Sequence, residues 1–368
     1  EKLLRCKIRG VVSPHAARRM LVAIATVLLN LAAASEAFHA QSSSCAWRTQ
    51  RHKRRRCATT TTMTEAPMNS AFVFVKPHAV TAPTITLVKE RLEKAGLTIT
   101  AEGDVASETI DEKKLVDNHY YAIASKATIT PPEELVVPEA KFKDFFGEEW
   151  ADVLKAGKAK TAIEAGKSLG LDGAAMDEAW GAAKKNGQII KLGGGFYCGK
   201  LSDDVYTFNA FYMSMRDRFT KPGGSIHYFV VEWDASVLPW ASFRGELLGP
   251  TDPSAAPAES IRGQIFANWA ALGLASEPNT GDNGVHASAS PFEGLAEKMN
   301  WLGLNPSDDP FGAYILGEGL SAETLAAWAK DPVVALDADG NKGSLFDALE
   351  DSDSPACAAK IKDLATLL

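Results

Sequence analysis

The amino-acid sequence predicts an α+β protein, in which β-strands and amphipathic helices follow one another along the chain. Residues 71–75 (AFVFV) form an apolar strand signal that stops at Lys76 and Pro77, because proline cannot continue a β-ladder. Residues 83–95 then place apolar side chains on one face of a helix. Residues 97–107 alternate apolar and polar side chains, as a half-buried strand does. The chain therefore opens with a strand, a helix and a second strand.

Further helices and one central strand follow the same pattern. Residues 111–125 and 208–219 are predicted to be helical, and 238–249 form a helix that ends at its glycine. Residues 225–233 (SIHYFVVEW) are almost wholly apolar, which is typical of a strand buried in the middle of a sheet.

Two segments interrupt or extend this pattern. Residues 126 to about 205 begin with a proline-broken linker and continue in helical stretches rich in alanine and lysine. Their triple glycine at 193–195 lacks the Lys-Ser/Thr ending of a phosphate loop, so it predicts a hairpin or flexible turn. Residues 304–368 form an acidic tail with several short helices. Its DADGNKG stretch (337–343) faintly resembles a calcium loop, but Lys342 stands where such a loop needs glycine and Ala348 where it needs glutamate. The predicted core is thus 70–303, with an insertion and a C-terminal extension.

Residues 1–69 have the composition of a targeting leader. A basic pair precedes the apolar run 20–34 and small residues follow it, which is the order of a secretory signal. The run is shorter than the roughly 20 residues that span a bilayer, so no stable membrane anchor is expected. Residues 38–63 are basic, hydroxylated and free of acids, as in a transit peptide. The leader resembles the two-part leaders of algae with complex plastids, which predicts a plastid location and would make Met20 the start; a cytoplasmic location is the alternative.

The bulk composition narrows the class of function. The net charge of -7 argues against a protein whose main task is to coat nucleic acid. Cys198 and Cys357 are the two cysteines of the body, and without CxxC spacing they suggest neither a zinc site nor a disulfide framework.

The segment around His286 carries the strongest chemical signal. Ser290 is followed by proline and, at the third position, by Glu293, so a helix with a capping box is predicted directly behind the histidine. Glu293 is expected to serve this cap, which leaves Glu297 to face the imidazole. A carboxylate that accepts from one ring nitrogen fixes the tautomer and presents the other nitrogen as a nucleophile.

Phosphoryl transfer also needs cations, because negative charge spreads over the transferred group in the transition state. Lys76 lies where a strand ends, Arg244 lies in a helix before a turn, and Arg262 lies in SIRGQIF. Thr251 adds a hydroxyl donor. These side chains lie at the ends of elements, where they are able to converge on one site.

Four motifs in order make the chain resemble the nucleoside diphosphate kinases. They are VKPHAV (75–80), the Asn-His-Tyr segment (118–120), LLGPTDP with SIRG (247–263) and NGVHAS (283–288). The resemblance implies that His286 is phosphorylated, with Ser288 and Glu297 as its supporting residues. It implies nucleotide-binding roles for Lys76, Tyr120, Phe211, Met215, Arg244, Thr251, Arg262 and Asn283.

The resemblance also implies a fold, a cofactor and partners. The family fold is a ferredoxin-like βαββαβ antiparallel sheet covered by helices, here with a mostly helical insertion. Mg2+ would accompany ATP as donor and nucleoside diphosphates as acceptors, with no metal held by protein ligands alone. Nucleic acid is not an expected partner, and a homo-oligomer is left open because the interval from Arg262 to Asn283 is longer than in compact members.

Some positions depart from the family pattern. His78 and Ala79 stand where aspartate and glycine are usual, Ala289 replaces an acidic residue, and Arg244 is one residue farther from Thr251. These departures motivate a second interpretation, a nucleotide-binding regulatory or scaffold protein that kept the pocket and lost fast turnover.

Overall fold

The computed structural model describes residues 67–368, so the predicted leader falls outside the described residues except for its last three. Four strands form the main sheet, in the order β2-β6-β1-β7, and every neighbouring pair is antiparallel. They are β1 (Asn69–Val75), β2 (Thr98–Ala106), β6 (Ser225–Trp233) and β7 (Val285–Ala287). The predicted α+β class is confirmed, with β6 in the interior of the sheet as its apolar sequence predicts.

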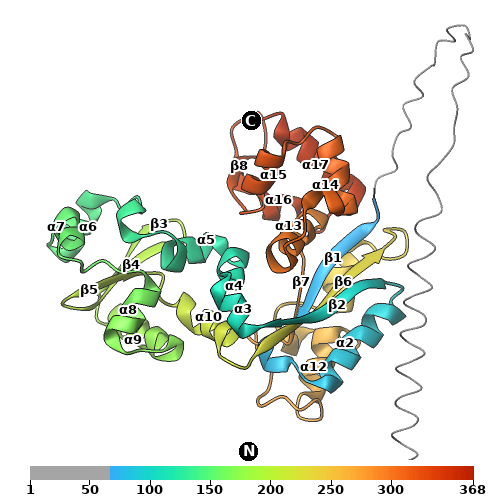
Figure 1. Ribbon diagram of the computed structural model, residues 1–368, viewed down its shortest axis with the longest axis horizontal. Coiled ribbons are helices and arrows are strands. Elements are labelled where there is room, and N and C mark those ends of the chain that lie inside the picture. Colours follow the sequence, from blue (N-terminus) through green and yellow to red (C-terminus); the bar gives the residue numbers. More distant parts are fainter. Residues whose placement is uncertain (1–66) are drawn as a thin grey trace, which may run out of the picture. The chain divides into compact units, whose positions relative to one another are not determined.

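Strand β1 is buried on both faces and separates two cores. Val73 and Val75 pack with helices α2 (Ala82–Lys94) and α12 (Ile261–Asn268). Phe72 and Phe74 point the other way, because successive side chains of a strand alternate between its faces. They join a core with α3 (Ser107–Glu112), α4 (Leu115–His119), α10 (Tyr212–Thr220) and α13 (Pro291–Leu302). Figure 1 shows α2 and α12 together beside the sheet.

Residues 111–125 do not form the single continuous helix that the sequence predicts. The segment is divided into α3, α4, α5 (Tyr121–Ala124) and the π-helical turn η2 (Ser125–Ile129). Lys114 adopts a left-handed conformation (φ 53°), and Tyr120 leaves the helical region (φ -100°, ψ 40°). These breaks turn His119 and Tyr120 toward the sheet, where both contribute to the site described below.

The insertion builds its own helices and a sheet that the sequence pattern did not reveal. Four helices are present as expected: α6 (Glu139–Phe146), α7 (Trp150–Lys155), α8 (Ala162–Leu169) and α9 (Gly173–Lys185). After them, β3 (Ile189–Gly193), β4 (Phe196–Ser202) and β5 (Val205–Phe208) form a three-stranded antiparallel sheet. The triple glycine makes the β3–β4 hairpin turn, as predicted. The insertion is mostly helical, as expected, and this sheet is an addition to its helices.

The C-terminal extension packs onto the helix that follows His286. It contains α14 (Pro310–Gly317), α15 (Ala322–Trp328), the hairpin β8 (Val333–Ala335) and β9 (Lys342–Ser344), α16 (Leu345–Leu349) and α17 (Ser354–Ala365). Phe292 and Leu295 of α13 lie in the same buried core as these helices. The DADGNKG stretch joins β8 to β9. Among residues 67–368 no helix has both the length and the apolar character needed to cross a membrane.

Helix α13 lies directly against β1, which yields a test of the fold. A Cβ added at Gly294 would lie 2.8 Å from the carbonyl oxygen of Ser70. Gly294→Ala is therefore expected to destabilise the protein by about 1–3 kcal/mol in urea unfolding, because the helix must move away from the strand. Gly181→Ala in α9 is the matched control: its Cβ would meet nothing within 4 Å, and alanine favours a helix. Equal stability of Gly294→Ala and wild type would contradict this close packing.

Candidate functional site

Strand β7 places His286 beside β1, and helix α13 supplies its carboxylate partner. Ser290 Oγ accepts from the Glu293 amide at 3.1 Å, and the helix therefore begins at Pro291, immediately behind the histidine. Glu297 Oε1 lies 2.5 Å from His286 Nε2, and Ser288 donates its hydroxyl to Glu297 Oε2, also at 2.5 Å. The Phe74 ring stacks on the imidazole at 4.7 Å. Strand, helix and stacked ring together fix the orientation of the imidazole.

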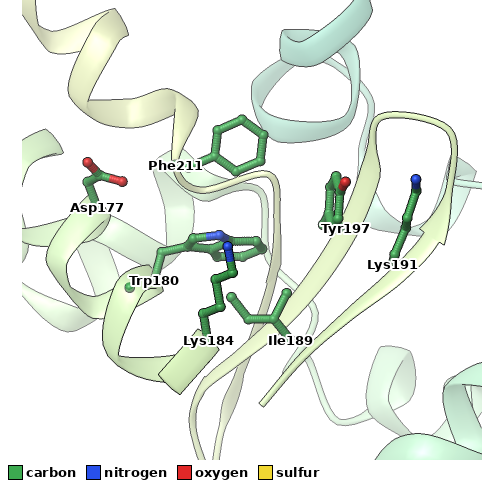
Figure 2. A pocket seen from close by; sticks show the side chains of 8 residues that line it. Asp177, Trp180, Lys184, Ile189, Lys191, Tyr197 and Phe211 are labelled. Carbon is green, nitrogen blue, oxygen red and sulfur yellow. The ribbon is translucent and has the colours of Figure 1, made fainter. Parts of the chain in front are cut away.

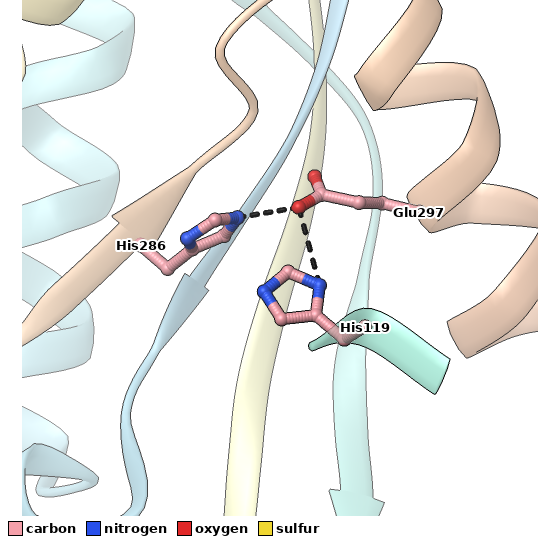
Figure 3. A group of neighbouring side chains, drawn as sticks. All are labelled: His119, His286 and Glu297. Atoms are coloured by element: carbon pink, nitrogen blue, oxygen red, sulfur yellow. Dashed lines mark hydrogen bonds and ion pairs between the residues drawn. The ribbon is translucent and has the colours of Figure 1, made fainter. Parts of the chain in front are cut away.

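A second histidine, His119, completes this cluster. Its Nδ1 lies 3.4 Å from Glu297 Oε1, and its ring stands edge-on to the His286 ring at 4.7 Å. Glu297 lies between the two imidazoles (Figure 3). The Asn-His-Tyr motif (118–120) predicts a role for Tyr120 alone, although His119 is adjacent to it.

The electrostatics of the cluster favour a neutral imidazole. Burial, reinforced by the nearby charges of Lys76 and Arg262, holds the pKa of His286 well below its usual value. Burial also raises the pKa of Glu297 to about 7. With a neutral ring, Nε2–H donates to Glu297, and Nδ1 keeps its lone pair. No residue in 67–368 forms a hydrogen bond with Nδ1.

His119, His286 and Glu297 also have the donor types of a metal site. Two ligands bound to one tetrahedral zinc at about 2.0–2.1 Å lie roughly 3.3 Å apart. The 2.5 Å between His286 Nε2 and Glu297 Oε1 is shorter than that spacing and is a direct hydrogen-bond contact. The cluster is therefore arranged to orient the imidazole.

His286 lines a cavity of about 600 Å³ that collects most of the predicted site residues. Lys76, at the end of β1, donates its ammonium to the Gly281 carbonyl at 3.2 Å, and its backbone amide bonds to Gly284 at 2.9 Å. Burial, followed by the Arg262 charge, lowers the pKa of Lys76 to about 8. The predicted residues that line the cavity are Lys76, Tyr120, Met215, Arg244, Thr251, Arg262, Asn283 and His286.

Arg262 and Asn283 are held by backbone groups of the same loops. Arg262 donates to the Val285 carbonyl (3.0 and 3.2 Å) and to the Gly249 carbonyl (2.7 Å), so it fixes the residue before His286. Asn283 donates to the Thr251 carbonyl at 3.0 Å. Its Oδ1 is buried and has no hydrogen-bond partner among residues 67–368. An unpaired buried acceptor of this kind costs about 1–3 kcal/mol.

His78, one of the departures from the family pattern, supports the loop before the nucleophile. Its Nε2 accepts from the Gly284 amide at 3.2 Å, and its Nδ1 lies 3.5 Å from Asp282. Gly284 has φ 87°, a conformation that glycine adopts without strain. The histidine therefore holds a glycine turn two residues before His286.

Two predicted side-chain placements are corrected. Glu293 was expected to complete the helix cap, yet its carboxyl group lines the cavity, and burial raises its pKa well above the usual value. Phe211 does not line this cavity. The centre of its ring lies 5.9 Å from that of Trp180 and 6.3 Å from that of Tyr197, in a separate hollow lined by residues of the insertion (Figure 2). The backbone is left-handed at Asn209 (φ 44°), and α10 begins only after Phe211. Its spacing to Met215 therefore does not form one base-binding surface.

Arg244 lines the cavity and is paired with two carboxylates that sequence analysis did not identify. Its Nη1 lies 2.6 Å from Glu350 Oε1 and 2.7 Å from Asp351 Oδ1. Both acids belong to the C-terminal extension and line the same cavity. The cavity is thus bounded by the core domain on one side and by the extension on another.

The chain has limited similarity to known proteins. No family model and no curated protein matches the chain. Solved structures similar to it include the nucleoside diphosphate kinase from Encephalitozoon cuniculi, at 16% identity over 64% of this chain and 90% of that chain, TM-score 0.31. An NDP kinase from Pyrobaculum aerophilum has 20% identity over 64% of this chain and 96% of that chain, with a TM-score of 0.32. The nucleoside diphosphate kinase from Aquifex aeolicus has 14% identity over 63% of this chain and 94% of that chain, with a TM-score of 0.32. Similarity at these identities and TM-scores assigns no activity to this chain.

Proposed function

We propose that the chain is a nucleoside diphosphate kinase that transfers a phosphoryl group through His286. One observation carries the proposal: a neutral imidazole, oriented by Glu297 and with Nδ1 unpaired, lines a cavity that also holds Lys76, Arg244 and Arg262. The strand order of the main sheet supports the ferredoxin-like arrangement that accompanies this function.

The reaction proceeds in two displacements at His286. Nδ1 attacks the γ-phosphorus of a bound nucleoside triphosphate, the bond from that phosphorus to the β,γ-bridging oxygen breaks, and the diphosphate leaves. Glu297 stabilises the positive charge on the phosphorylated ring through Nε2–H. A terminal phosphate oxygen of an acceptor diphosphate then attacks the phosphorus, and the N–P bond breaks. The imidazole returns to its neutral form.

The cavity provides the contacts that such substrates need. The cations of Lys76 and Arg262 neutralise charge that develops on the transferred group. Asn283 and Thr251 line the same cavity and place an amide and a hydroxyl group beside the nucleotide. Tyr120 and Met215 give an apolar wall to the nucleoside.

Magnesium fits the chemistry of this cavity as part of the substrate. Mg2+ prefers oxygen ligands and is usually held by phosphates with one or two carboxylates. The phosphates would therefore supply most of its ligands. When bound with the nucleotide, the ion would offset part of the negative charge of the phosphates.

Phosphoenzyme formation tests the proposal directly. Protein incubated with [γ-32P]ATP alone is expected to take up acid-labile, base-stable label and to pass it to GDP on addition of that nucleotide. A protein that binds ATP and takes up no label is the outcome that would reject the kinase. It would favour the regulatory alternative, for which the pairing of Arg244 with two acids is the supporting observation.

The alkaline pH dependence is expected to follow Lys76. Because its pKa is lowered to about 8, the free protein loses this charge as the pH rises through 8, and kcat/KM falls up to tenfold per unit above it. Lys76→Arg keeps a charged group at this position, so its decline moves to higher pH even if its rate is lower. Measurement of kcat/KM from pH 6 to 10 for both proteins tests this, and an unmoved decline in Lys76→Arg would assign it to another group.

A further inference from the structure

The segment that joins α16 to α17 is fastened to the core domain beside the cavity. Asp353 accepts from the Asn69 side chain at 2.7 Å and from the Trp240 amide at 2.8 Å. The Ser354 amide donates to Asn69 at 2.8 Å. These bonds attach the segment to the start of β1 and to the start of the helical segment that carries Arg244.

Asp351 is held in an uncommon backbone conformation by this attachment. Its φ of 57° is left-handed, and its amide donates to the Ala289 carbonyl at 2.9 Å, three residues after His286. A non-glycine residue in this region costs about 1 kcal/mol or more, and it persists where the surroundings fix it. The result is that the Glu350 and Asp351 carboxylates face the cavity.

The two acids bind the cation that the nucleotide phosphates require. Both contact the same nitrogen of Arg244, so one guanidinium group is matched by two negative charges. Arg244 is 28% exposed, while Glu350 and Asp351 are 44% and 47% exposed. Phosphate oxygens and carboxylates offer an arginine the same kind of charge-assisted hydrogen bond. They therefore compete for the same donor.

We propose that Glu350 and Asp351 form an anionic gate of the nucleotide site, which competes with the substrate's phosphates for Arg244 and so sets the affinity for nucleotides. The gate rests on the proposed function, since it concerns the same cavity. The C-terminal extension is in this view a component of the site, and a bound diphosphate must displace its two carboxylates or share the guanidinium with them.

Binding of ADP, measured by titration calorimetry on the full chain, tests the gate. The Glu350→Gln/Asp351→Asn variant keeps the side-chain size, and asparagine tolerates the left-handed conformation at position 351. It is expected to bind ADP about tenfold more tightly than wild type at low salt, with a smaller gain at high salt, because two negative charges near the phosphates are removed. In an Arg244→Ala background the same double replacement is expected to give a smaller gain.

A matched control lies in the same extension. Glu318 pairs with Lys362 at 3.1 Å, away from the cavity, and Glu318→Gln is expected to leave ADP binding unchanged. Equal or weaker ADP binding by a double variant that unfolds at the wild-type temperature would overturn the gate while leaving the kinase proposal intact. A gain of the same size without Arg244 would also overturn it. Failure of both wild type and the double variant to bind ADP would instead count against the proposed function.

Discussion

His286→Ala is expected to lower ATP-to-GDP exchange by roughly 10⁴-fold or more and to abolish labelling by [γ-32P]ATP. The variant loses the only atom that forms the covalent intermediate, and the cations that remain bind phosphate without a nucleophile to accept it. The imidazole lines the cavity, so its replacement by alanine enlarges a space that is already open. ADP binding is expected to survive, which separates loss of chemistry from loss of the site.

His227→Ala provides the matched control for this replacement. His227 lies on β6, pairs with Asp104 at 2.8 Å, and does not line the cavity. It is expected to keep both label and exchange. Label that persists in His286→Ala, or that disappears in His227→Ala, would show that the nucleophile has been assigned to the wrong residue.

The sheet and the helix behind His286 were predictable because local signals and tertiary packing agree there. The apolar runs of β1 and β6 indicate directly that these strands are buried, and Ser290 with Pro291 marks where α13 begins. The spacing of Glu297 on that helix then determines which way its carboxyl group points. In such segments the sequence pattern needs no information from distant residues.

The breaks within residues 111–125 were not predictable. The sequence pattern of this segment favours one continuous helix, yet Lys114 takes a left-handed conformation and Tyr120 leaves the helix. The gain lies elsewhere: Leu115 and Val116 enter the core under Phe74, and His119 reaches Glu297. Packing against the sheet outweighs local propensity here, and only the tertiary structure reveals it.

The residues that line the cavity were likewise predictable only in part. Residues carried by recognisable motifs converge on His286, while Glu350 and Asp351 carry no motif and lie more than sixty residues away along the chain. Acids on a short helix end are ordinarily solvated, so their sequence gives no sign that they contact Arg244. Phe211 shows the opposite error. Its spacing to Met215 fits the base-binding residues of the family, yet its side chain packs against Trp180 of the insertion.

Glu297→Gln is expected to reduce exchange on the order of 10³-fold, although glutamine has nearly the same shape. The carboxylate accepts from His286 on one oxygen and from Ser288 on the other. Glutamine has only one acceptor oxygen, which the Ser288 hydroxyl takes, and its amide group then donates to Nε2. The ring proton moves to Nδ1, so the nitrogen that must attack phosphorus is blocked.

The pH dependence distinguishes this tautomer effect from a loss of packing. In wild type, kcat/KM is expected to fall below pH 7, because the pKa of Glu297 is raised to about 7 and the protonated carboxyl group donates to Nε2 in the same way as glutamine. Glutamine does not titrate, so the variant keeps its low rate without this acid decline. Ser288→Ala leaves the His286–Glu297 bond in place and is expected to lose less than Glu297→Gln. Since burial opposes the charge on Glu297 and Ser288 favours it, the Ser288→Ala decline is expected at higher pH than in wild type. An acid decline that is unchanged in Glu297→Gln would show that some other group controls the protonation of the nucleophile.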